Sequence, residues 1–254
     1  MIRFFRTIRQ RILTENKFNK YLLYAIGEIL LVVVGILLAL QIDTWNEQQK
    51  QRQESREFTM RLEKEVLKNI ASAEAEMATE ESQTHAAGTI LQLFNEAGTP
   101  QSEALLDSLV YIILSNNTLE IVTGTLNEGF NTGKIAIITS DSLRSALYNL
   151  PSSIEEIRKQ EEIDREDVNG HFTNFLYHNF NYRNMDNRYS PYKGVIGSTK
   201  FTSYSSRSLL DSQTFENMVD NRFWNSQEQL KQLRRFHGEL SLIASLIEKV
   251  LERE

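Results

Sequence analysis

One carboxylate lies inside an otherwise uncharged apolar stretch, and its chemistry is the most distinctive in the chain. The stretch runs from Tyr21 to Ile42, and Glu28 is its only formal charge. A carboxylate at the centre of a membrane helix costs roughly 2.5–3.5 kcal/mol on insertion scales, so it needs a partner, a proton or a route to water. Three interpretations follow: a hydrogen bond to a neighbouring helix, a proton or ion relay, or a protonated side chain that reaches the cytoplasmic interface.

Two small residues accompany this carboxylate. Gly35 and Ala39 follow Glu28 at seven and eleven residues along the chain, so all three share one face of a helix. Small residues four apart permit the close approach of two membrane helices. We therefore favour a helix–helix contact face made by Glu28, Gly35 and Ala39.

A second candidate is an aromatic-rich segment, residues 172–192, which also carries several asparagines and two arginines. Aromatic rings beside amides and guanidinium groups can stack sugar rings or bind a protein surface. The simpler alternative is an aromatic helix face that continues into a loop and caps the fold. The candidate ligand or partner patch consists of Phe172, Phe175, Tyr177, Tyr182, Arg183, Arg188 and Tyr189.

Residues for catalysis or metal binding form no familiar pattern. The chain has no cysteine, and its four histidines are His85, His171, His178 and His237. His171 and His178 can share a helix face, but no third ligand and no H-E-x-x-H motif accompanies them, and we expect His237 to be a core histidine. No phosphate-binding loop or nucleophile elbow is present. We expect no enzymatic activity, no metal and no cofactor.

The elements that position these residues begin with a membrane helix. The 22 residues from Tyr21 to Ile42 span about 33 Å as a helix, enough for a hydrocarbon core of about 30 Å. A cleaved signal peptide is the alternative, but no small residue follows Ala39 to form a cleavage site. The sequence therefore predicts an uncleaved signal anchor.

Charge predicts the orientation of this helix. The 20 residues before it carry six Lys or Arg, and residues 43–57 after it carry three. Since basic flanks stay in the cytoplasm, the N-terminus is expected inside and the body outside. Residues 43–254 have a net charge of −10, which disfavours nucleic acid as a partner.

Four regions follow: a basic segment 1–20, the membrane helix 21–42, a polar juxtamembrane stalk 43–57 and a body 58–254. In the basic segment, Phe5, Ile8 and Ile12 have helical spacing, which favours an amphipathic helix in the anionic leaflet. The alternative is a disordered basic stub that only sets the topology.

The body reads as all-α. Residues 45–97 contain no proline and one glycine, so they can continue the membrane helix, and 103–114 form a short apolar helix. The run Ile135–Ile138 lacks a partner strand, so we expect a buried turn or irregular segment. The fold class is an up-down helical bundle with its first and last helices adjacent.

Three finer expectations concern the second half of the body. Ser140 or Asp141 caps a helix to Leu150, and Pro151 starts the next helix, which runs to Phe180. That helix contains RKQEEIDRED, which we interpret as a solvated face. Residues 226–254 carry a heptad pattern made by Leu230, Leu233, His237, Leu240, Ala244, Ile247 and Leu251, broadened by Phe236, Ile243 and Val250.

Two stretches resemble a known family. The run FFRTIRQRILTENKFNKYLLYAIGEILLVVVGILLALQIDTWNE (4–47) is similar to the N-terminal signature of a family of small membrane proteins from flavobacteria and related Bacteroidetes, a domain of unknown function. TLNEGFNTGKIAIITSDSLRSAL (125–147) is similar to its middle motif. The resemblance implies one N-terminal membrane helix, a helical extracytoplasmic body and a Gram-negative inner membrane. It brings no activity and no site residues.

These features favour a periplasmic interaction or scaffold protein anchored in the inner membrane. Its expected partners are the lipid bilayer and other envelope proteins or copies of itself. The alternative is a periplasmic sensor or binding module for a small envelope ligand, with residues 172–192 lining the site. A sensor usually needs a cytoplasmic output domain, and the 20 residues before the membrane helix are too few to form one.

Overall fold

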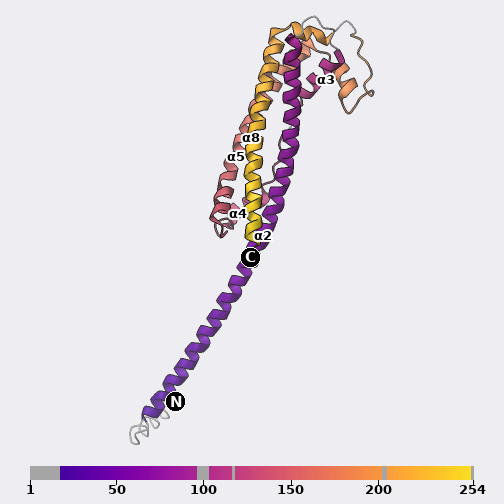
Figure 1. The fold of residues 1–254 in the computed structure, drawn as a ribbon. Coiled ribbons are helices and arrows are strands. Elements are labelled where there is room, and N and C mark those ends of the chain that lie inside the picture. Colours follow the sequence, from indigo (N-terminus) through magenta and orange to yellow (C-terminus); the bar gives the residue numbers. More distant parts are fainter. Residues whose placement is uncertain (1–17, 96–102, 116–117, 202–204, 253–254) are drawn as a thin grey trace. The chain divides into compact units, whose positions relative to one another are not determined.

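The computed structural model describes residues 18–95, 103–115, 118–201 and 205–252 (Figure 1). All regular elements in these ranges are helical, and no strand occurs among them, which confirms the all-α class. The chain divides into two compact units, with the division between Glu57 and Phe58. Helix α2 (Phe18–Asn95) contributes to both units.

The first unit is Met1–Glu57, and its described part is helix α2 from Phe18 onward. Its helix is long and apolar enough to cross a membrane, and the apolar window is not buried against other residues. The next residues, 43–57, are polar apart from Trp45, and nearly all are exposed. Residues 1–17 of the expected basic amphipathic segment 1–20 lie outside the described residues.

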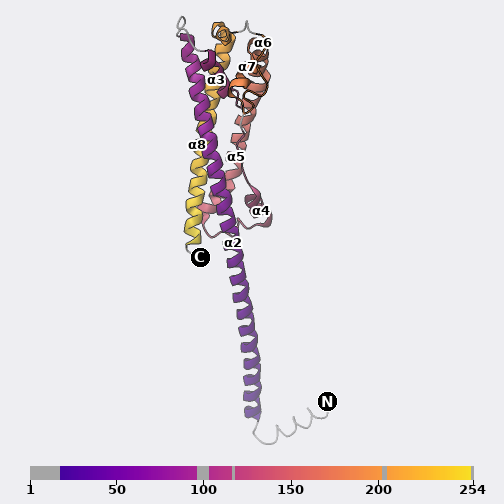
Figure 2. The same ribbon diagram turned by 90° about the vertical axis from the view of Figure 1, so that its right-hand side faces the viewer.

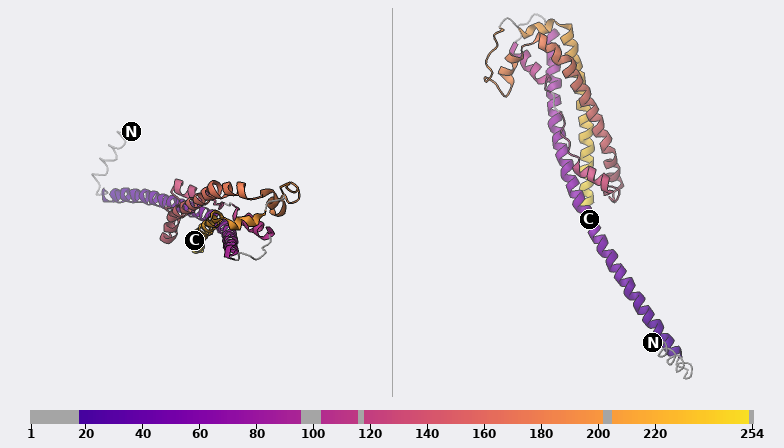
Figure 3. Two further views of the ribbon diagram at one scale, coloured as in Figure 1. Left: turned by 90° about the horizontal axis from the view of Figure 1, so that it is seen from above. Right: turned by 180° about the vertical axis from the view of Figure 1, so that it is seen from behind.

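The second unit contains three long helices: α2 from Phe58 onward, α5 (Asp141–Asp167) and α8 (Gln213–Leu251). Figures 2 and 3 show them side by side. Helix α8 runs antiparallel to α2, because its later residue His237 contacts Glu74 and its earlier residue Arg222 contacts Gln83. The expected contact between the first and last helices of the body is present.

Helices α2 and α5 run in the same direction. Arg222 and Arg235 of α8 pair with Asp164 and Glu156 of α5, so α5 is also antiparallel to α8. In an up-down bundle, long helices that follow one another along the chain alternate in direction. The expected up-down order is therefore wrong for α2 and α5. The chain returns between them through α3 (Glu103–Ile113), the non-helical residues 118–123 and α4 (Gly124–Thr132).

Side chains of the long helices satisfy the backbone of this returning segment, which has no partner strand. Asn69 Nδ2 donates to the Val122 carbonyl at 2.7 Å, and Asn69 Oδ1 accepts from Val122 N at 2.8 Å. Glu161 accepts from Leu119 N at 2.7 Å. These bonds hold the segment against α2 and α5.

Helix α5 continues through Pro151. Ser140 Oγ accepts from Leu143 N at 3.3 Å, which confirms the predicted cap. The prediction that Pro151 starts a new helix is wrong, because α5 extends without a break to Asp167. Proline removes one backbone donor, but Leu147 and Leu150 of the preceding turn are buried, and their packing keeps the helix continuous.

A π-helical segment, Val168–Phe172, joins α5 to α6 (Thr173–Asn179). Such segments insert an extra residue and change which side chains face the core. Here Val168, Phe172 and Leu176 are all buried. Beyond them lie α7 (Tyr182–Tyr189) and the 3-10 helix η2 (Ser206–Asp211).

Helix α8 begins at Gln213, well before the predicted start at Ser226, because Ser212 Oγ caps it by accepting from Phe215 N at 3.3 Å. The buried face of α8 confirms the predicted apolar periodicity, but not every residue of the predicted heptad pattern is buried. The side chain of His237 is 30% exposed and contacts Glu74, so the expectation of a core histidine is wrong. The buried apolar residues from Leu230 onward are Leu230, Leu233, Phe236, Leu240, Ile243, Ile247 and Val250.

The run 135–138 is irregular, as expected, with Ile135 and Ile138 buried and Ile137 exposed. It belongs to the first of two apolar clusters, in which α2, α5 and α8 meet, with Phe58, Leu147 and Leu240 among its members. The second cluster joins the end of α2 to α3, α6, α7 and the start of α8.

Candidate functional site

The proposed helix–helix face is exposed in the first unit. Glu28, Gly35 and Ala39 lie on the same side of α2, and a Cβ atom added at Gly35 would meet nothing within 4 Å. This face therefore presents one carboxyl group and a small-residue surface that a second helix can approach.

The aromatic segment does not form a single patch. Phe172 is fully buried in the second cluster, and its ring centroid lies 6.1 Å from that of Phe215. Phe175 stacks on the same Phe215 ring at 6.1 Å. Tyr177 is 69% exposed, and its ring lies 5.3 Å from that of Tyr182. Part of the segment is thus core, and part is surface.

The polar members of this segment brace α7 within the fold. Arg188 Nη1 lies 2.8 Å from Asp107 Oδ2 of α3, and the Tyr189 hydroxyl donates to the Ala104 carbonyl. Arg183 Nη2 donates to the Ile196 carbonyl at 2.7 Å. A cavity of about 510 Å³ lies beside Arg183, bordered by Phe180–Arg183 and Ser198–Phe201.

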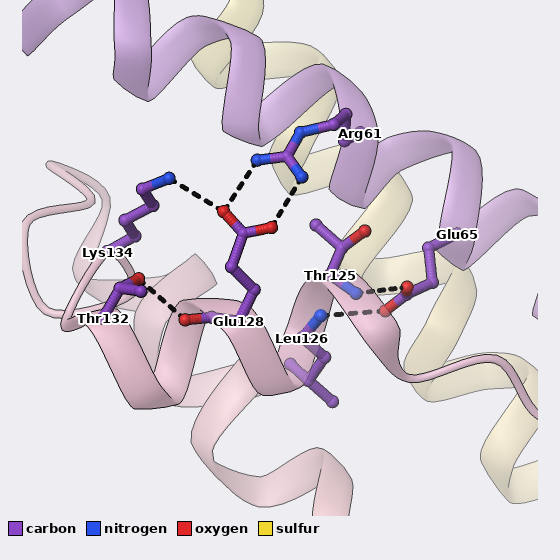
Figure 4. A network of polar contacts seen from close by, with 7 residues as sticks. All are labelled: Arg61, Glu65, Thr125, Leu126, Glu128, Thr132 and Lys134. Atoms are coloured by element: carbon purple, nitrogen blue, oxygen red, sulfur yellow. Dashed lines mark hydrogen bonds and ion pairs between the residues drawn. The ribbon is translucent and has the colours of Figure 1, made fainter.

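The motif at 125–147 includes most of helix α4, and Figure 4 shows the polar contacts that join this helix to α2. Glu65 of α2 accepts from Thr125 N at 2.6 Å and from Leu126 N at 2.9 Å. These amides belong to the first turn of α4, where a carboxylate is favoured by both the free donors and the helix dipole. Glu65 therefore fixes the start of α4 on α2.

An ion-pair network fixes the next turn of α4. Arg61 Nη1 and Lys134 Nζ lie 2.6 and 2.8 Å from the carboxylate of Glu128 (Figure 4). Hydrogen bonds from Arg61 and Lys134 lower the pKa of Glu128 to about 2. The carboxylate stays ionised at neutral pH and joins α2, α4 and the loop after α4.

Gly129 permits the close packing of α4. A Cβ atom there would lie 2.6 Å from Phe58 Cζ and 2.8 Å from Ile135 Cγ1, and both neighbours are buried. We expect Gly129→Ala to lower the free energy of unfolding by about 1–3 kcal/mol through overpacking. Thermal unfolding of the full chain, followed by circular dichroism, measures this change.

Gly238 in α8 is the matched control for this substitution. A Cβ atom at Gly238 meets nothing within 4 Å. Because alanine has a higher helix propensity, Gly238→Ala should stabilise the chain by up to about 1 kcal/mol. A Gly129→Ala variant as stable as the wild type would contradict the close contact with Phe58.

A buried ionic layer crosses the second unit. Arg222 of α8 is 1% exposed, and its guanidinium contacts Asp164 of α5 and Gln83 of α2. Glu80 of α2 faces the same layer and is 7% exposed. Burial, with a smaller contribution from Asp164, outweighs the attraction of Arg222 and raises the pKa of Glu80 to about 7.

Further carboxylates surround this layer. Burial raises the pKa of Glu76, with a contribution from Glu161, and burial also raises the pKa of Asp167. Arg158 Nη1 pairs with Glu161 at 2.7 Å at the edge of the layer. The layer thus combines several acidic groups with one fully buried cation.

This layer was missed in the sequence. The run RKQEEIDRED was expected to be a solvated face with one apolar residue, and that expectation is wrong for part of it. Gln160 and Glu161 are buried, whereas Ile163 is 53% exposed. The available signal was the helical spacing of Gln160, Asp164 and Asp167, which places polar residues on one stripe.

Among the residues that the structure describes, no group of three His, Cys, Asp or Glu side chains could hold a metal ion. The polar contacts described above serve two purposes. It holds α2, α5 and α8 at a fixed level through buried charge, and it holds α4 on α2.

Comparison with known families decides the membership of the chain. The family described as "Family of unknown function (DUF6090)" matches residues 28–157. The chain belongs to this family. Comparison with curated proteins and with solved structures found no match. The matched range includes Glu28, Arg61, Glu65 and Glu128, so the α4 motif lies wholly within the DUF6090 match. The match ends before Arg222, so the ionic layer lies only partly within it.

Proposed function

We propose that the chain is a single-pass protein of the inner membrane whose helical body lies in the periplasm and acts as an interaction or scaffold component. The observation that carries this proposal is the exposed apolar part of α2 in the first unit. The same helix continues into the second unit, which has its own core. The resemblance to flavobacterial membrane proteins supports the inner membrane of a Gram-negative bacterium.

The packing of residues 172–192 supports a scaffold over a ligand sensor. A sensor site there requires polar groups that converge on an open apolar pocket. Phe172 and Leu176 instead fill the second cluster, and Arg188 is paired with Asp107. The cavity beside Arg183 remains, but the guanidinium there already donates to the Ile196 and Gly197 carbonyls. We expect no enzymatic activity.

Self-association through the membrane helix is the most specific form of the proposal. Lipid offers Glu28 no hydrogen-bond partner, whereas a second copy offers a carboxyl or backbone group. Gly35 and Ala39 lower the steric barrier on the same face. Polar contacts between membrane helices contribute about 0.6 kcal/mol on average, so other parts of the chain must add contact surface.

Cysteine cross-linking tests this contact directly, because the native chain contains no cysteine. A single cysteine at Gly35 should cross-link efficiently in membranes, and a cysteine at Val33, off the face, should not. Glu28→Leu should reduce the cross-linking at position 35. Equal cross-linking at both positions, or none with Glu28 intact, would refute the contact and favour the protonated side chain at the interface.

A further inference from the structure

The loop after α7, residues 190–201, carries large apolar side chains in exposed positions. Tyr192 is 67% exposed, Val195 is 77% exposed and Phe201 is 65% exposed. Lys193 and Lys200 beside them are also exposed. Contiguous exposed apolar surface marks sites of protein or membrane interaction, and these three side chains come from one loop of 12 residues.

The fold holds this loop in place. Gly194 and Gly197 have φ values of +77° and +67°, which only glycine adopts at little cost and which turn the chain on both sides of Val195. Asn187 Oδ1 accepts from Gly194 N at 3.0 Å, and Arg183 donates to the Ile196 carbonyl. The loop is therefore built to keep Val195 outside the core.

Charge distinguishes the loop from the rest of the body. Residues 190–201 have a net charge of +2 and contain no acidic residue, whereas the other residues of 58–254 sum to −11. This contrast indicates an anionic partner for this surface. The charged residues of the loop are Lys193 and Lys200.

We propose that residues 190–201 bind an anionic lipid surface, with Tyr192 and Val195 entering the interface and Lys193 and Lys200 contacting the headgroups. Tyrosine and lysine suit this role because each combines an apolar body with a polar end. A lipid surface accepts both the charge and the exposed apolar side chains. An acidic protein surface matches the charge but not the aliphatic residue at the turn. This binding is separate from the membrane helix and adds a second lipid contact.

A vesicle-capture experiment tests this binding with the full chain. The basic segment 1–20 would itself bind anionic vesicles, so every sample carries Arg3→Ser, Arg6→Ser, Arg9→Ser and Arg11→Ser. The protein is reconstituted in phosphatidylcholine nanodiscs, so that its membrane helix is already occupied. The nanodiscs are then mixed with protein-free vesicles of phosphatidylglycerol and phosphatidylcholine and separated by flotation. We expect nanodiscs with the protein to float with these vesicles, and to float much less with vesicles of phosphatidylcholine alone.

Variants of the loop locate the contact. Each lysine near an anionic surface contributes about fivefold to binding, so Lys193→Ser with Lys200→Ser should weaken capture about 25-fold. Tyr192→Ser with Val195→Ser should also weaken it at least about fivefold. Leu242→Ser, which alters another exposed apolar residue, should leave capture unchanged.

Three results would overturn the proposal. They are the absence of capture by anionic vesicles, capture that survives both loop variants, and equal loss in Leu242→Ser. Absence of capture would make an acidic protein the better partner for the loop. A chain that fails to enter nanodiscs would instead contradict the membrane anchor, so the two proposals fail in different ways.

Discussion

Replacement of Arg222 with methionine should lower the free energy of unfolding by about 4 kcal/mol, because it leaves buried carboxylates without their cation. Arg222 is 1% exposed and pairs with Asp164, which is itself largely buried. Breaking a buried ion pair by removing one partner is more costly than replacing both. Denaturant unfolding of the full chain in nanodiscs measures the loss.

Two further variants separate the charge effect from lost packing. Arg222→Met combined with Asp164→Asn removes both charges, and we expect it to recover part of the lost stability. Arg234→Met removes an exposed arginine of the same helix that pairs with Glu81, so it should cost less than about 1 kcal/mol. Equal effects of Arg222→Met and Arg234→Met would contradict the buried layer.

The second large effect concerns Glu80 and pH. Its pKa is about 7 in the folded chain against an ordinary value of 4.5, so the folded state binds this proton more tightly than the unfolded state. The resulting stabilisation is fully present below about pH 4.5 and is lost as the pH rises through about 7. The difference corresponds to about 3 kcal/mol.

Glu80→Gln should remove this dependence. The variant and the wild type should be similarly stable near pH 4, and the variant should be more stable by about 3 kcal/mol near pH 8. Denaturant unfolding at a series of pH values provides the comparison. Glu81→Gln on the exposed side of α2 is the control and should keep the profile of the wild type. A Glu80→Gln variant whose stability falls with pH as steeply as the wild type would refute the assignment to Glu80.

Much of the helical content could be predicted from the sequence, because long apolar periodicities determine it. The membrane segment, the short helix α3 and the apolar face of α8 all carry such patterns. The continuation of α5 through Pro151 could not be predicted, because the packing of Leu147 and Leu150 outweighs the local preference of proline. The parallel direction of α2 and α5 could not be predicted either. It depends on the non-helical residues 118–123 between these helices, and their sequence has no periodic pattern.

The polar sites were harder to predict. Charged residues in a sequence are expected to be exposed. This expectation fails where side chains of other helices provide the opposite charge or the hydrogen bonds that a buried charge needs. Arg222, Asp164 and Gln83 are far apart in the sequence and meet only in the fold. The roles of Glu65 and Glu128 could not be predicted for the same reason. The motif at 125–147, which includes Glu128, stood out only because it is similar to the middle motif of a known family.

The proposed periplasmic partners all depend on the orientation of the membrane helix. Alkaline phosphatase fused after Glu254 folds into its active form only outside the cytoplasm, and a reporter that works only in the cytoplasm provides the opposite readout. With the body outside the cytoplasm, we expect active phosphatase and an inactive cytoplasmic reporter at this position, and the chain should remain in the membrane fraction. Active cytoplasmic reporter with inactive phosphatase would contradict this orientation.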